Sequence, residues 1–157
     1  MSLPVAVALF ACIFLGEAGL PLFVPAELAL VAAGAAVGAS WASVEFACVA
    51  LVADVLGAVV LYSIVRHGAT LAARIPRLAR LSSAVERAAG RAGARSARRV
   101  ACARCIPLLR VPAAFGAGIS RLSLPSFVAA ASIGSIVWVS VFLASGMALG
   151  GEFSVFR

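Results

Sequence analysis

Two arginines, Arg104 and Arg110, lie on either side of Pro107 in a stretch that is otherwise almost entirely apolar. An arginine near the middle of a bilayer costs at least about 2.5 kcal/mol, so such a residue is usually paired or functional. The planar guanidinium group binds a phosphate through two parallel hydrogen bonds. These residue types in this spacing therefore indicate a site for a phosphate-bearing substrate inside a membrane.

The six-residue spacing of the arginines places a demand on the backbone. On an unbroken helix they would point about 240° apart, whereas a turn at Pro107 would bring both to one cavity. We therefore assign substrate binding to Arg104, Pro107 and Arg110. In the alternative interpretation, both arginines only pair with acidic residues elsewhere in the fold.

Three acidic residues, Glu17, Glu27 and Asp54, interrupt the apolar sequence of the first half. Acidic side chains at membrane depth commonly serve in proton relays, so we expect these three to couple protons to the movement of an anion. The alternative for either glutamate is a structural role, as a helix cap or a counter-ion. The role of Asp54 is more open.

Composition restricts the class of protein. Of the 157 residues, 64% are hydrophobic and 12% are charged, about half the charged fraction of a soluble domain, which predicts one membrane domain over residues 1–157. The net charge of +7 lies mainly between apolar segments without interleaved aromatic residues, which argues against nucleic acid. A lone Cys102-Ala-Arg-Cys105 with one distant histidine predicts neither a metal site nor a cofactor.

The elements that must position these residues are apolar helices and broken hairpins. A helix over Ser43–Val65 would be about 34 Å long, enough to cross a bilayer, and Leu124–Gly150 is a second span. Each span follows a segment in which proline and glycine interrupt apolar sequence, which favours a re-entrant hairpin. A short apolar helix, Leu3–Leu15, precedes the first hairpin, which comprises the interruption at 16–27 and Leu28–Val37; the second hairpin covers Val100–Ser120.

A basic segment, Ile75–Arg99, joins the two halves and is predicted to form an amphipathic helix on the membrane surface, with Gly90 and Gly93 as breaking points. Six arginines fall within an arc of about 80°: Arg77, Arg80, Arg87, Arg91, Arg95 and Arg98. They bind anionic lipid head groups or, alternatively, form a solvated face that only sets topology. Because basic loops stay cytoplasmic, residues 66–99 are expected to face the cytoplasm.

The similar order of elements in the two halves of the sequence therefore predicts an all-α polytopic membrane protein built from two inverted repeats. Each repeat is a re-entrant broken hairpin plus a transmembrane helix. Such folds hold their substrate near the bilayer midplane, between the broken helices. Self-association into a homo-oligomer is left open.

An ordered set of motifs between Gly16 and Gly150 resembles the DedA family of bacterial inner-membrane proteins, also called the SNARE-associated or VTT-domain group. The motifs are Glu17-x-x-x-Pro21-x-x-x-Pro25-x-Glu27, Gly57-x-x-x-x-Tyr62-x-x-x-Arg66, Arg104-x-x-Pro107-x-x-Arg110, Gly134-x-x-x-Trp138 and Gly146-x-x-x-Gly150. The resemblance implies a flippase or scramblase in the bacterial inner membrane, with undecaprenyl phosphate as the best candidate substrate. It also implies that the paired acidic residues of the first hairpin belong to proton-coupled function.

Two other functions compete with transport. A lipid-phosphate phosphatase would need a nucleophile or base beside the arginines, but the second hairpin contains neither serine nor histidine before Ser120. We therefore expect no enzymatic activity. A non-transporting scaffold for envelope maintenance would use the arginines between Arg77 and Arg98 to dock partners.

Overall fold

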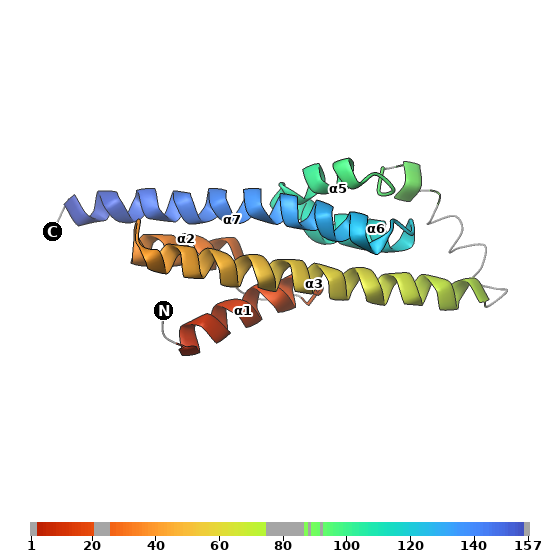
Figure 1. Ribbon diagram of the computed structural model, residues 1–157, viewed down its shortest axis with the longest axis horizontal. Helices are drawn as coiled ribbons and strands as arrows, with labels where there is room; N and C mark the ends of the chain where they lie inside the picture. Colours follow the sequence, from red (N-terminus) through yellow and green to blue (C-terminus); the bar gives the residue numbers. More distant parts are fainter. Residues whose placement is uncertain (1–2, 21–25, 75–86, 88, 92, 156–157) are drawn as a thin grey trace. The chain divides into compact units, whose positions relative to one another are not determined.

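The computed structural model describes residues 3–20, 26–74, 87, 89–91 and 93–155, with the side chains of 72–74 and 151–155 left out. All regular structure in these ranges is helical (Figure 1), as the sequence predicts. The elements are α1 (Leu3–Glu17), α2 (Ala26–Val37), α3 (Trp41–Arg74), α5 (Ala97–Arg104), the 3₁₀ turn η1 (Pro107–Leu109), α6 (Arg110–Ile119) and α7 (Leu124–Val155).

Two helices, α3 and α7, are long and apolar enough to cross a bilayer. Their apolar stretches are Trp41–Leu71, with a mean hydropathy of 2.4, and Leu124–Gly150, with 2.2. At about 1.5 Å per residue both exceed the roughly 30 Å hydrocarbon core. The second agrees with the predicted span. The first is longer than the predicted Ser43–Val65, because α3 begins at Trp41 and continues to Arg74.

Both predicted interruptions of the short segments are present. Helix α1 ends at Glu17, Gly19 follows with a φ of 92°, and α2 begins at Ala26. Pro21 and Pro25 lie outside the described residues. In the second half, α5 ends at Arg104 and η1 begins at Pro107. Ile106 is extended (φ −102°, ψ 119°), as expected for a residue before proline.

The predicted basic helix over Ile75–Arg99 is broken at Gly93, one of its two expected breaking points. Gly93, with a φ of 87°, starts a turn, and the Ser96 side chain then caps α5 by accepting from the Arg99 backbone N–H at 3.5 Å. Arg98 therefore belongs to α5. Residues 75–86, including Arg77 and Arg80, lie outside the described part. The remaining predicted lipid contacts are exposed: Arg87, Arg91, Arg95 and Arg98.

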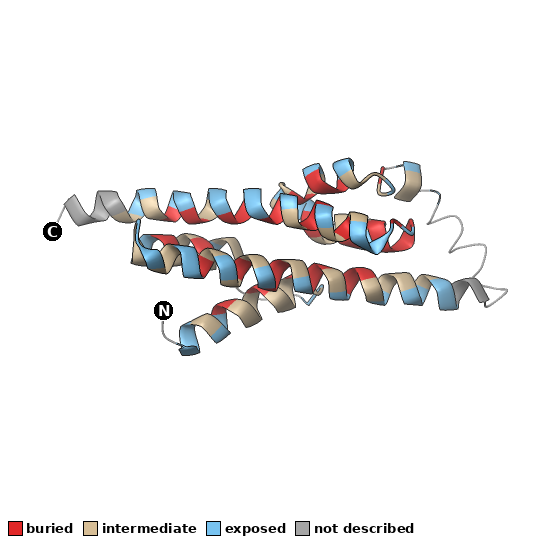
Figure 2. Ribbon diagram, viewed as in Figure 1, coloured by how far each residue is buried: buried red, intermediate tan, exposed pale blue. Residues whose placement is uncertain are grey.

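Buried positions recur every three to four residues along α3 and α7 (red in Figure 2), as expected for helices that pack on one face. The chain forms two compact units. The first unit, residues 1–57 and 135–157, has a core that draws residues from α1, α2, α3 and α7. Its buried members are Leu9, Ile13, Leu30, Phe46, Ala50, Ala53, Trp138, Val139 and Leu143.

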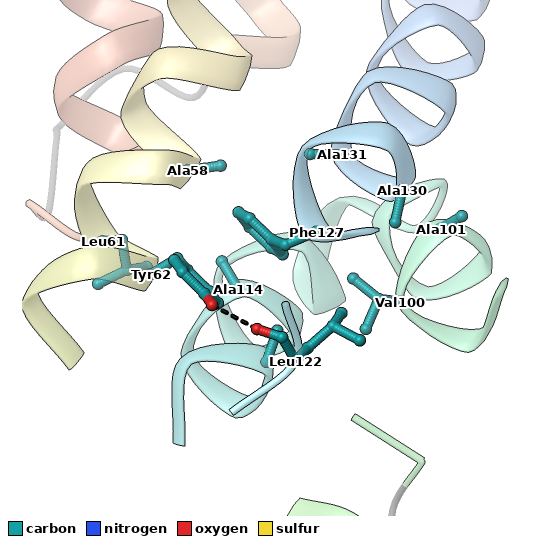
Figure 3. Packing of buried hydrophobic residues seen from close by; sticks show 11 residues of the cluster. Ala58, Leu61, Tyr62, Val100, Ala101, Ala114, Leu122, Phe127, Ala130 and Ala131 are labelled. Carbon is teal, nitrogen blue, oxygen red and sulfur yellow. Dashed lines mark hydrogen bonds between the residues drawn. The ribbon is translucent and has the colours of Figure 1, made fainter. Parts of the chain in front are cut away.

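The second unit, residues 58–134, joins α5 and α6 to the remaining parts of α3 and α7. Figure 3 shows its core, in which Tyr62 stacks on Phe127 with ring centroids 4.6 Å apart. Most of the other core residues are small: Ala58, Ala101, Ala114, Ala117, Ala130 and Ala131. Small side chains let the helices of this unit approach closely. Each unit thus combines two short helices with one segment from each long helix.

Candidate functional site

Arg104 and Arg110, the predicted phosphate ligands, are both buried, with exposed fractions of 0% and 2%. They lie in the same unit, at the end of α5 and at the start of α6. The Nη1 group of Arg104 donates a hydrogen bond to the backbone carbonyl of Arg110 at 3.3 Å. The break between the two helices therefore places these arginines side by side, which a straight helix would not do.

Pro107 has the position that this break requires. It is the first residue of η1, where a missing backbone N–H is tolerated because the first turn leaves its N–H groups unpaired. The backbone N–H of Arg110 donates a hydrogen bond to the Pro107 carbonyl. Pro107 is therefore a positioning residue for the arginine pair.

Gly134 of α7 determines how closely Arg104 approaches that helix. A Cβ atom at Gly134 would lie 2.7 Å from the Cβ of Arg104 and 3.1 Å from the backbone oxygen of Ala101. The first distance is too short for a real Cβ atom, and the second is tight enough that the neighbouring backbone would have to shift. Gly134 appears in the sequence motif, but its contact with Arg104 follows only from the packing of α5 on α7.

In the other unit, Asp54 of α3 and Ser135 of α7 are both fully buried. The Ser135 hydroxyl donates a hydrogen bond to Oδ2 of Asp54. Sequence reasoning selected Asp54 but missed Ser135, which is 81 residues away. The available signal was a serine one helical turn before the buried Trp138, on the same face of the span.

Glu17 and Glu27 have different surroundings. Glu17, the last residue of α1, is 7% exposed, and a Cβ at Gly57 would lie 2.7 Å from its Cβ. Since Asp54 and Gly57 are one turn apart on α3, Glu17 packs on the helix face that carries Asp54. Glu27 is half-buried in the first turn of α2, where a carboxylate is favoured by the helix dipole. Glu27 therefore fits the structural alternative better than Glu17 does.

Each unit contributes its own charged set: Glu17 and Asp54 belong to the first, and Arg104 and Arg110 to the second. Among the described residues, no group of three or more His, Cys, Asp or Glu side chains could hold a metal ion. Cys102 is an exposed free thiol and Cys105 is a half-buried one.

Sequence reasoning also missed a polar network around Tyr62. This residue is 1% exposed, and its hydroxyl donates to the Leu122 carbonyl (Figure 3) and accepts from Arg66. Arg66 also donates to the Leu122 carbonyl at 2.9 Å. Tyr62 therefore packs in the core of the second unit, and its network connects the turn after α6 to α3.

A comparison with known proteins finds one match. The sequence model of a family described as VTT domain matches residues 24–148. No curated protein and no solved structure matches the chain.

Proposed function

We propose that this chain, which belongs to the VTT-domain or DedA family, is a membrane protein that moves a phosphate-bearing lipid between the two leaflets. The protein would act as a flippase or scramblase and would not catalyse a reaction on the lipid. Two helices long and apolar enough to span a bilayer support this proposal. Undecaprenyl phosphate is the first substrate to test, because of the resemblance described above.

The observation that carries the proposal is the buried arginine pair. Arg104 and Arg110 are held together at a helix break within a mostly apolar sequence. Burying two cations is expensive unless an anion or a hydrogen-bond network compensates them. Their planar forks suit a phosphate monoester, whose hydrocarbon tail would stay in the lipid. The residues of the pair would therefore bind the head group during its passage.

Proton coupling is the proposed role of the acidic residues. Asp54 and Glu17 are buried in one unit, next to the same face of α3. An anionic lipid that entered beside them would favour protonation of a carboxylate, because like charges repel in a medium of low dielectric constant. Glu27 completes the predicted set, although its place at the start of α2 also suits a capping role.

The architecture we propose is a pair of inverted repeats. Two broken pairs of short helices, α1 with α2 and α5 with α6, each precede a long apolar helix. Opposite orientation of these pairs would let them expose one site alternately to each face. The exposed arginines between residues 87 and 98 would contact anionic head groups on the cytoplasmic side of a bacterial inner membrane.

A reconstituted liposome assay tests this function. Wild type, Arg104→Ala and Arg110→Ala would be compared for translocation of undecaprenyl phosphate and of a phospholipid, with and without a pH gradient. We expect both variants to lose at least tenfold in initial rate, while a variant at the exposed Arg121, Arg121→Gln, keeps the wild-type rate. If the wild-type protein moves no lipid under any pH gradient, the transport proposal is wrong and the scaffold hypothesis is favoured. Release of inorganic phosphate from the lipid would indicate the phosphatase instead.

A further inference from the structure

A cavity of about 710 Å³ opens on the second unit, and neither Arg104 nor Arg110 is among its lining residues. Its walls come from α5, η1, α6 and the segment that precedes α5. The walls are almost wholly apolar and include Val100, Ala103, Leu109, Val111, Phe115 and Ile119. The volume lies within the range of about 300–1,000 Å³ of small-molecule sites.

Arg99 is the only charged side chain among the described residues that line this cavity. It is exposed and follows the turn that begins at Gly93. A Cβ at Gly93 would lie 2.8 Å from Nη1 of Arg99, so the guanidinium group rests on the glycine backbone. Glycine at this position therefore allows the left-handed φ and also leaves room for the guanidinium group of Arg99.

The apolar wall continues to the surface. Leu109 and Phe115 line the cavity and are 44% and 48% exposed. Exposed apolar side chains beside an apolar cavity indicate contact with a hydrophobic ligand or with lipid. The cavity thus joins a hydrocarbon-compatible interior to a cationic edge.

We propose that this cavity binds one hydrocarbon chain of an anionic phospholipid, whose phosphate pairs with Arg99. The apolar wall matches the chain, and the single cation matches the phosphate. Lipids without net charge would bind less well, because their head groups carry no net negative charge to attract the arginine. The site is separate from the Arg104–Arg110 pair and does not depend on transport.

Photolabelling tests the site directly. The full chain would be reconstituted into phosphatidylcholine vesicles that contain a small fraction of phosphatidic acid with a diazirine in its acyl chain. After irradiation, mass spectrometry should find the label on the cavity walls, chiefly on Leu109, Val111 and Phe115. Excess inorganic phosphate should not reduce labelling, because the tail contributes binding that the free ion lacks. A label spread evenly over the exposed faces of α3 and α7, or competition by free phosphate, would overturn the proposal.

Matched variants test the two halves of the ligand. Arg99→Gln should lower cavity labelling about fivefold, the effect of one basic residue near an anionic surface. The exposed Arg121, which does not line the cavity, serves as control through Arg121→Gln. Ala103→Phe should block the cavity, while Cys102→Phe adds the same bulk at an exposed position outside it.

Equal labelling of Arg99→Gln and Arg121→Gln would overturn the role of the cation. Arg99 is exposed, so its replacement by glutamine should leave the protein folded. Undiminished labelling of folded Ala103→Phe would overturn the site itself. Because the readout is binding, a protein that fails the liposome transport assay can still pass this one, so the two proposals fail separately.

Discussion

The guanidinium group of Arg104 donates a hydrogen bond to the backbone carbonyl of Arg110 across the break between α5 and α6. This bond links a side chain on one side of Pro107 to the backbone on the other side. It fixes the position of the first arginine relative to the second before any ligand arrives. A site organised in this way loses little conformational entropy when it binds an anion.

Arg104→Lys should reduce lipid translocation at least tenfold although it keeps the charge. Lysine is a point charge without the planar fork, and losing a hydrogen bond from a charged group costs about 1.5–3 kcal/mol, where about 1.4 kcal/mol is a factor of ten. The initial translocation rate of the reconstituted variant gives the answer. Arg91→Lys, at an exposed position, is the matched control and should be silent. A wild-type rate for Arg104→Lys would show that only the charge matters.

The Asp54–Ser135 hydrogen bond should appear as a coupling energy between α3 and α7. Hydrogen bonds between helices in membrane proteins average about 0.6 kcal/mol in double-mutant cycles and reach about 1.7 kcal/mol. We expect a value in this range from Asp54→Ala, Ser135→Ala and the double variant, measured by unfolding in mixed micelles. A parallel cycle with the exposed Ser140 in place of Ser135 should give zero. Equal coupling in both cycles would contradict a direct bond.

The long helices and the positions of the breaks were predictable because they depend on local sequence. An apolar run longer than a bilayer predicts α7, and Leu124–Gly150 agrees with it. Pro107 lacks the N–H that a helix interior needs and forces Ile106 to be extended, so the break follows from two neighbouring residues. The start of α5 was predictable only in part, because the roles of Ser96 as a cap and of Gly93 as a turn residue compete with the arginine periodicity.

Contacts between distant segments could not be predicted in this way. Nothing in the local sequence of Ser135 identifies Asp54 as its partner, and nothing around Leu122 indicates that its carbonyl accepts from Tyr62 and Arg66. These pairs depend on the register in which helices pack, which is set by the whole buried face of each helix. The candidate arginines were therefore found from sequence, whereas most of the residues that surround the site were not.

Tyr62→Phe should lower the free energy of unfolding by about 0.5–1.5 kcal/mol, the net value of a typical hydrogen bond. The loss stays small because Arg66 still donates to the Leu122 carbonyl at 2.9 Å. Tyr62→Leu should cost about 0.5–1.5 kcal/mol more, since it also removes the ring stacked on Phe127. Denaturant titration of the wild type and the two variants in micelles measures the order of their free energies of unfolding. Equal stability of the two variants would show that stacking contributes nothing.

Gly134→Ala and Gly68→Ala should change stability in opposite directions, although both add one methyl group within a long helix. At Gly68 a Cβ meets no atom within 4 Å, so alanine gains about 0.8–1.0 kcal/mol of helix propensity. At Gly134 the same atom would lie 2.7 Å from the Cβ of Arg104 and 3.1 Å from the backbone oxygen of Ala101. Helix α5 must then move away from α7, and overpacking of this kind costs about 1–3 kcal/mol.

The two glycine variants also separate stability from function. Moving α5 displaces Arg104, so Gly134→Ala should lose lipid translocation even below the temperature at which it unfolds, whereas Gly68→Ala should transport at the wild-type rate. Thermal unfolding in detergent and the liposome assay, run on the same preparations, distinguish these effects. If Gly134→Ala is as stable and as active as the wild type, α5 does not pack on α7 at this position and the buried arginine pair is not held as described.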